Sequence, residues 1–374
     1  MIQALAWSVA VAAAPPIRIG ATVSLSGKYQ EPSAMVREAF KLWEKQVNER
    51  GGLLGRPVQL ILYDDQSKEE RVRRLYQKLI AADKVDLVFS PYSTPLTLAA
   101  SAVTEKHRLV LVAGGASGEP IWERGYRYIF GVNSPAKRYY IGFLDLMARH
   151  GLETVNILYE NSPFQINVGL GAQEWATRLG LKVVRCKAYK QGPAELPGLV
   201  KEVMAAPAQG LIFCSYPNDS YELLRLLQEA HHRPQVLCLT IAASFPEFKE
   251  RVGEMAEGVF ASSQWEADTR MPFPGTREFI ENYKARTRKL PSYHAGSAYA
   301  ACQIVEKAIT ATGSLNQEKI RDFISSLDTL TVIGRFRVDE TGKQIGHNPI
   351  IIQWQQGKKE IVYPLNMQTA APKF

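Results

Sequence analysis

The chain has 374 residues, of which 46% are hydrophobic and 22% charged, and its formal net charge is +8. This length exceeds what one hydrophobic core usually organises, so two domains are expected. Basic residues are scattered among acidic ones, as in Lys68-Glu69-Glu70-Arg71, which indicates solvated helix faces. The composition therefore predicts a globular protein without a nucleic-acid partner.

The first residues form a short apolar segment, from Ile2 to Ala14, that is too brief to span a bilayer. It ends in Ala-x-Ala spacing before Pro15-Pro16, as a signal-peptide cleavage site does. A basic stretch before the apolar run is missing, so residues 1–15 are interpreted as a signal-peptide remnant; an unstructured N-terminus is the alternative. We therefore expect an exported, periplasmic protein.

The first half of the chain alternates between strands and amphipathic helices. A strand within Pro16–Gly27 opens it, and the next predicted elements are helix 34–50, strand 57–64, helix 68–83, strand 85–90, helix 95–106 and strand 109–113. The strands are continuous Val, Leu and Ile runs, which is typical of parallel sheets covered by helices on both faces. This pattern predicts one doubly wound α/β unit.

A second unit repeats the alternation. Its predicted elements are helix 135–150, strand 154–159, helix 166–179, strand 181–188, helix 195–206, strand 209–214, helix 219–231, strand 235–240, helix 245–254 and strand 258–263. Helices 274–288, 292–312 and 316–327 follow, and the tail 331–363 is predicted to be β-structure. Ligands of such sheets bind beyond the carboxyl ends of the strands.

Motifs for catalysis and metal binding are missing from the sequence. It contains no HExxH, GxSxG or phosphate-binding loop motif, and its cysteines form no CxxC pair. We therefore expect no catalytic residue, no metal and no cofactor. The four cysteines are interpreted as buried free thiols, although Cys214 and Cys238 lie on strands that could be neighbours.

Several motifs, taken in order, resemble the type I periplasmic substrate-binding proteins of ABC importers, in the branched-chain amino acid and amide-binding (Leu/Ile/Val-binding) branch. The resemblance covers residues 17–364. Its motifs are Gly20-Ala-Thr-Val-Ser-Leu-Ser-Gly27, Asn48-x-x-Gly-Gly-Leu-Leu-Gly55, Asp64-Asp65, Gly125-Tyr, Gly334-x-Phe-x-Val-Asp-x-x-Gly342 and Trp354-x-x-Gly357.

The resemblance implies a monomer with two parallel-sheet lobes joined by a three-segment hinge. A ligand is clamped between the lobes and delivered to a membrane permease. We expect one lobe in residues 16–133 plus 262–330 and the other in 134–261 plus 331–374. The alternative is a ligand-sensing regulator of the same fold, of the amide-sensor type, which acts through protein partners.

Candidate ligand-binding residues follow the predicted strands. Ser93 starts a helix with Pro95 in its first turn, so it suits a helix cap whose free N–H groups attract an anion. In the family, its counterpart binds the ligand carboxylate. Gly115, Ala116 and Ser117 match a cradle for the polar head of the ligand.

Aromatic residues complete the candidate set. By the resemblance, Phe164 and Tyr216 match positions that cover the ligand, and Tyr29, Tyr92 and Trp265 lie at further strand or loop ends. Ordinary loop packing is the alternative for each of them. Together they favour an apolar or aromatic ligand body.

One departure from the family concerns charge. The family's amino acid binders place an acid after the strand that matches 235–240, where it pairs with the ligand ammonium. Here Leu239-Thr-Ile-Ala-Ala-Ser244 contains none, although Asp219 or Glu266 could substitute. Because a buried ammonium without a partner is costly, we expect a small carboxylate with an apolar or aromatic body, and an amino acid or amide is the alternative.

Overall fold

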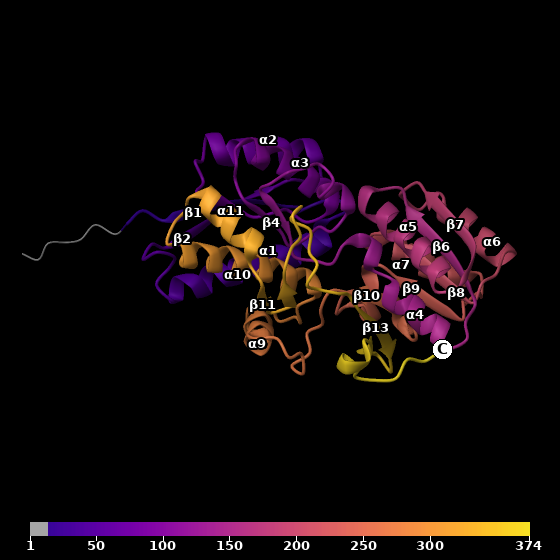
Figure 1. Cartoon of the computed structure of the whole chain (residues 1–374). Coiled ribbons are helices and arrows are strands. Elements are labelled where there is room, and N and C mark those ends of the chain that lie inside the picture. The colour runs from indigo at the N-terminus through magenta and orange to yellow at the C-terminus, as the bar shows by residue number, and fades with distance from the viewer. Residues whose placement is uncertain (1–13) are drawn as a thin grey trace, which may run out of the picture.

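The computed structural model, which describes residues 14–374, shows two α/β lobes side by side (Figure 1). The predicted fold class, with two parallel-sheet lobes, is confirmed. The predicted signal-peptide remnant lies almost wholly outside the described residues. Within residues 14–374, no helix is long and apolar enough to cross a membrane.

The first lobe is built on short parallel strands. β1 lies between β2 and β3, and β4 pairs with β5. The strands are β1 (Ile17–Val23), β2 (Val58–Asp64), β3 (Leu87–Val88), β4 (Leu111–Ala113) and β5 (Ile129–Gly131). The helices between them are α1 (Gln30–Glu49), α2 (Glu69–Ala81), α3 (Thr94–Lys106) and the 3₁₀ turn η1 (Glu119–Ile121).

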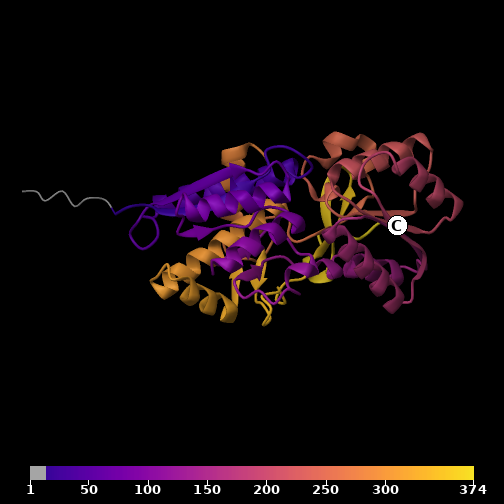
Figure 2. The ribbon, with the colours of Figure 1, turned by 90° about the horizontal axis from the view of Figure 1, so that it is seen from above.

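Later segments of the chain pack on this same lobe, and Figure 2 shows the orange helices beside the indigo ones. They are α9 (Thr276–Thr287), α10 (Tyr293–Thr312), α11 (Gln317–Ser326) and the hairpin of β11 (Thr329–Thr331) and β12 (Gly334–Phe336). Buried Trp43 of α1 donates its indole N–H to Glu306 of α10 at 2.7 Å. This bond ties the N-terminal helix to a segment more than 250 residues later.

The second lobe contains one seven-stranded sheet in the order β14-β13-β10-β9-β8-β6-β7. Five strands are parallel, and the last two join antiparallel. The strands are β6 (Thr154–Glu160), β7 (Lys182–Tyr189), β8 (Gly210–Cys214), β9 (Val236–Leu239), β10 (Phe260–Ser263), β13 (Ile350–Gln355) and β14 (Lys358–Tyr363). Its helices are α4 (Ile141–Arg149), α5 (Pro163–Arg178), α6 (Leu196–Ala205), α7 (Pro217–Glu229) and α8 (Phe248–Val252).

Some predicted elements differ from the structure. The predicted helix 135–150 divides into the 3₁₀ turn η2 (Ala136–Arg138) and α4, with Tyr140 in a non-helical conformation before α4. The predicted helix 245–254 is shortened to α8, because Gly253 takes a positive φ of 59° and a 3₁₀ turn, η4 (Gly253–Ala256), follows. Two more 3₁₀ turns are η3 (Ala242–Ser244) and η5 (Leu365–Met367).

The chain passes between the lobes three times. The passages lie between β5 and η2, between β10 and α9, and between β12 and β13. The lobe boundaries stay a proposal, and two contacts refine it: Gly131 donates its N–H to Gly342, and Gln344 donates to the carbonyl of Val132. These bonds favour a third passage nearer 345–349 than 331.

All four cysteines are free, and three are buried as expected, whereas Cys186 is only partly buried. Cys214 and Cys238 lie on the neighbouring strands β8 and β9, and both are buried.

Candidate ligand-binding site

Where the lobes meet, side chains from both enclose a small cavity of about 20 Å³, the space that one ordered water needs. Seven of the predicted residues line it: Tyr92, Ser93, Gly115, Ala116, Ser117, Phe164 and Tyr216. Sequence reasoning missed four others, Thr94, Asn133, Tyr139 and Tyr293, and left His294 open. The structure therefore brings most of the predicted set to one place.

The N-terminus of α3 points its polar groups at this cavity. Ser93 caps the helix: its Oγ accepts a long hydrogen bond of 3.4 Å from the N–H of Leu96, and Pro95 lies in the first turn, as predicted. Ser93 has φ 82° and ψ 150°, a conformation that only glycine adopts readily. Such strain is typical of functional sites, and here it places a hydroxyl beside the free N–H groups of a helix start.

The turn after β4 forms the second polar wall. The carbonyl of Gly115 accepts from the N–H of Ser93 at 2.9 Å, which joins the turn to the helix start. A side chain at Gly115 would press on Tyr92, since a Cβ there would lie 3.0 Å from its Cα. The hydroxyls of Ser117 and Tyr139 lie 2.9 Å apart across the lobes. The turn is therefore a close-packed cradle.

Five aromatic rings face the cavity. The rings of Tyr139 and Phe164 meet edge to face with centroids 5.2 Å apart. Tyr216 is buried, and its hydroxyl has no hydrogen-bond partner among residues 14–374. Because an unpaired buried hydroxyl costs free energy, this group suits a ligand atom.

Tyr29 lies one layer behind the wall. Its ring packs edge-on against Tyr92 and Tyr216, with centroid distances of 5.9 and 4.9 Å. Burial raises the pKa of its hydroxyl, and the charge of Lys28 opposes the rise. Tyr29 supports the two cavity tyrosines, and direct ligand contact stays a prediction.

Trp265 lies away from the cavity wall. It is fully buried, packs against Phe279 at a centroid distance of 5.8 Å, and lies against Gly296 of α10. The structure does not bring it to the other predicted residues.

His294 both starts α10 and lines the cavity. Its ring nitrogens face Tyr92 at 3.4 Å and Ser292 at 3.2 Å. Burial lowers its pKa to about 3, so the ring is neutral near pH 7. A neutral imidazole can donate one hydrogen bond and accept another, and it adds no positive charge to the cavity.

Among the described residues, no carboxylate lines the cavity. Asp219 accepts from the hydroxyl of Tyr189 and the N–H of Gly192 within the second lobe, and Glu266 pairs with Lys359. Both acids that could have substituted for the missing one are thus already engaged. Among residues 14–374, no group of His, Cys, Asp and Glu side chains is arranged to hold a metal ion.

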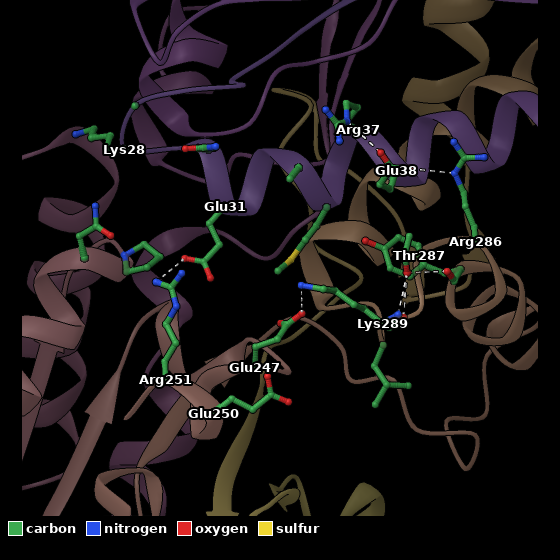
Figure 3. A pocket seen from close by; sticks show the side chains of 18 residues that line it. Lys28, Glu31, Arg37, Glu38, Glu247, Glu250, Arg251, Arg286, Thr287 and Lys289 are labelled. Atoms are coloured by element: carbon green, nitrogen blue, oxygen red, sulfur yellow. Dashed lines mark hydrogen bonds and ion pairs between the residues drawn. The ribbon is translucent and has the colours of Figure 1, made fainter. Parts of the chain in front are cut away.

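A much larger hollow, of about 870 Å³, opens between the lobes beside α1, α8 and the end of α9. Charged side chains point into it from both sides (Figure 3). Arg251 of one lobe pairs with Glu31 of the other at 3.7 Å, and Lys289 pairs with Glu247 at 3.0 Å. This hollow forms the wide outer part of the cleft between the lobes, and charged residues line it. The small cavity, which is lined by aromatic rings and hydroxyl groups, has the composition of a binding site.

The fold is that of a two-lobed α/β protein with a small cavity lined by residues of both lobes. A family model described as periplasmic binding protein matches residues 16–359, and the chain belongs to this family. Its members are binding proteins and not enzymes, as expected for this chain.

Individual proteins show the same likeness. The chain is 26% identical to Leu/Ile/Val-binding protein homolog 8 of Brucella abortus, over 99% of this chain and 96% of that protein. The structure of a leucine-binding protein from Thermotoga maritima has a TM-score of 0.83 at 19% identity and covers 92% of this chain and 97% of its own. A solute-binding protein of an ABC transporter from R. palustris, in complex with benzoate, has a TM-score of 0.82 at 15% identity, with 95% and 98% covered.

Proposed function

We propose that this protein is the exported, monomeric solute receptor of an ABC importer, and that it binds a small carboxylate with an apolar or aromatic body. The observation that carries the proposal is the composition of the cavity. A helix start and two serine hydroxyls face five aromatic rings, and no acid of the described part of the chain lines the wall. This arrangement suits a carboxylate at one end and a ring or branched chain at the other.

The missing acid separates this ligand class from amino acids. An α-ammonium in the cavity would lose its water and gain no carboxylate partner there, whereas a charge-assisted bond contributes about 1.5–3 kcal/mol. The leucine-binding and benzoate-binding neighbours show that this fold holds either class. The lining of the cavity in this protein favours a carboxylate without an amino group, the class to which benzoate belongs.

Calorimetric titration with matched ligand pairs tests the proposal. The pairs are 4-methylpentanoate with L-leucine and 3-phenylpropanoate with L-phenylalanine, and benzoate is added as a compact aromatic acid. We expect binding of the acids without an amino group and binding at least tenfold weaker for each amino acid. Tight binding of leucine or phenylalanine alone would contradict the proposed ligand class.

A pair of serine variants ties any binding to this cavity. Ser117→Ala removes a cradle hydroxyl and should weaken carboxylate binding about tenfold. Ser325→Ala alters an exposed serine of α11 and should change nothing. In cells, loss of the protein should lower uptake of the labelled ligand.

A further inference from the structure

Lys28 reaches from the first lobe into a buried part of the second. Its Nζ lies 3.4 Å from Oε1 of Glu160, at the end of β6, and 2.9 Å from Oε1 of Gln191. The Glu160 side chain is only 1% exposed, and Lys28 is 26% exposed. Lys28 also lines the wide cleft, at the upper left of Figure 3, so it lies between that cleft and the buried tyrosines.

Two aromatic rings complete the surroundings of this ammonium. The Nζ of Lys28 lies 5.0 Å from the ring centroids of both Tyr29 and Tyr216, within the range of a cation–π interaction. Tyr216 also forms part of the cavity wall. One ring therefore touches both the ligand cavity and the lysine.

Glu160 is under-satisfied for a buried acid. Its second oxygen, Oε2, has no hydrogen-bond partner among the residues that the structure describes. Burial raises the pKa of Glu160, and the charge of Lys28 opposes the rise. The Glu160 carboxylate thus has one cationic partner, Lys28, and its second oxygen can still accept a hydrogen bond.

The loop that carries Lys28 is fixed and not free to swing. Ser24 donates to Asp65 at 2.6 Å, and the Oγ of Ser67 donates to the carbonyl of Ser26 and accepts from the N–H of Tyr29. These bonds hold residues 24–29 against the end of β2. The position of the lysine is therefore a built feature of the first lobe.

A buried acid with two flanking tyrosines is what a ligand ammonium would require. We propose that Lys28 fills this acid-and-tyrosine cage (Glu160, Tyr29 and Tyr216) with its own ammonium group and thereby makes the protein select carboxylates that lack an amino group. The inference rests on the proposed function and names the residue that sets its ligand class.

Lys289 offers a matched comparison. It also pairs across the lobes, with Glu247, but its side chain is 65% exposed and no ring lies over its ammonium among the described residues. A variant of Lys289 therefore removes one cross-lobe charge and leaves the cage intact.

Calorimetry on four variants tests the assignment, with 3-phenylpropanoate and L-phenylalanine as the probes. They are Lys28→Met, Glu160→Gln, their double variant, and Lys289→Met. The quantity compared is the ratio of the two affinities. Lys28→Met vacates the cage, so the ratio should shift about tenfold or more toward L-phenylalanine. The double variant lacks the Glu160 carboxylate, so its affinity ratio should not shift toward L-phenylalanine. Lys289→Met should leave the ratio unchanged.

Two outcomes separate the failure of this inference from that of the proposed function. If wild type binds 3-phenylpropanoate and Lys28→Met leaves the ratio within twofold, the role of Lys28 is overturned and the ligand class stands. If wild type binds neither probe, the carboxylate class fails for these acids. The thermal unfolding of the same variants then decides: the effects of Lys28→Met and Glu160→Gln must be strongly non-additive, and additive effects overturn the cage.

Discussion

Ser93 combines a functional position with a conformation that is costly for serine. Its φ of 82° and ψ of 150° cost about 1–3 kcal/mol in a non-glycine residue, and its capping bond is long. Ser93→Gly removes the strain, whereas glycine as a helix cap loses only a few tenths of a kcal/mol. We therefore expect the free energy of unfolding to rise by about 1 kcal/mol while carboxylate affinity falls about tenfold.

Urea unfolding and calorimetry measure these two effects of Ser93→Gly. Ser93→Ala is the matched control, because it loses the hydroxyl and keeps the strain, so it should lower both stability and affinity. A glycine variant less stable than the alanine variant would show that the backbone at Ser93 is not strained.

His294 predicts a pH dependence of stability. Its pKa is lowered to about 3 by burial and, secondarily, by the charge of Lys359, from an ordinary value near 6.5. Between these values the unfolded chain binds a proton that the folded protein does not, so the histidine's contribution to stability falls as the pH drops from 6.5 toward 3.

The variant His294→Gln should flatten this slope by about 1 kcal/mol per pH unit between pH 6.5 and 4.5. Unfolding free energies of wild type and variant across this range provide the measurement. Because the buried acids titrate in both proteins, the difference between their two slopes gives the contribution of His294 alone. The exposed His107→Gln serves as control, and equal slopes for all three proteins would contradict the burial argument.

At the scale of elements, α5 and the turn η2 position two cavity rings, Phe164 and Tyr139. Gly171 of α5 makes their packing possible, since a Cβ there would lie 2.4 Å from the Cα of Lys137 in η2. Gly171→Ala should destabilise the fold by about 1–3 kcal/mol and weaken ligand binding, although alanine favours helices.

Gly198 of α6 is the matched control for this element. It is exposed, and a Cβ there would have nothing within 4 Å. Gly198→Ala should therefore stabilise the protein by about 0.5–1 kcal/mol. Thermal melts of the two variants should shift in opposite directions, and a shift in the same direction would contradict the close packing of α5 on η2.

The sequence predicts those site residues that stand directly at an element boundary. Ser93 was predicted from its capping position before Pro95, whereas Ser117 and Tyr216 were predicted because the resemblance to the family matches them to ligand-binding positions after strands. Asn133 lies on the first passage between the lobes, and Tyr139 follows the 3₁₀ turn η2, where the sequence predicts a continuous helix 135–150. Their place in the cavity depends on how two lobes dock, which no local pattern contains.

Secondary structure was likewise predicted well only where it depends on the local sequence. Long buried strands such as β6 and amphipathic helices such as α1 were predicted within a few residues, because their apolar spacing is strong. The three-residue strand β5 and the break between η2 and α4 were missed. Both depend on contacts with distant segments, which outweigh local preference.

At the scale of the molecule, ion pairs such as Arg251–Glu31 join the two lobes across the cleft. Arg251 and Glu31 are 52% and 29% exposed, so their pair contributes little and is screened by salt. Arg251→Glu places like charges across the cleft and should weaken ligand binding about two- to fivefold at low salt.

The charge-swapped double variant, Glu31→Arg with Arg251→Glu, should restore the affinity. Small-angle X-ray scattering should show a larger radius of gyration for the single variant alone. The difference should fade near 1 M salt, where the screening length is about 3 Å. A deficit that persists at high salt would mean that Arg251 acts through packing on Tyr221 and not through charge.

The position of the C-terminal hairpin has a consequence for how the chain is made. β13 and β14 complete the sheet of the second lobe, next to β10, only after the chain has returned through the first lobe. During synthesis, therefore, the edge of β10 stays open until β13 has emerged. A chain cut short before Ile350 would keep that edge exposed, ready to pair with strands of other chains, so this truncation should produce aggregates and not a weaker binder.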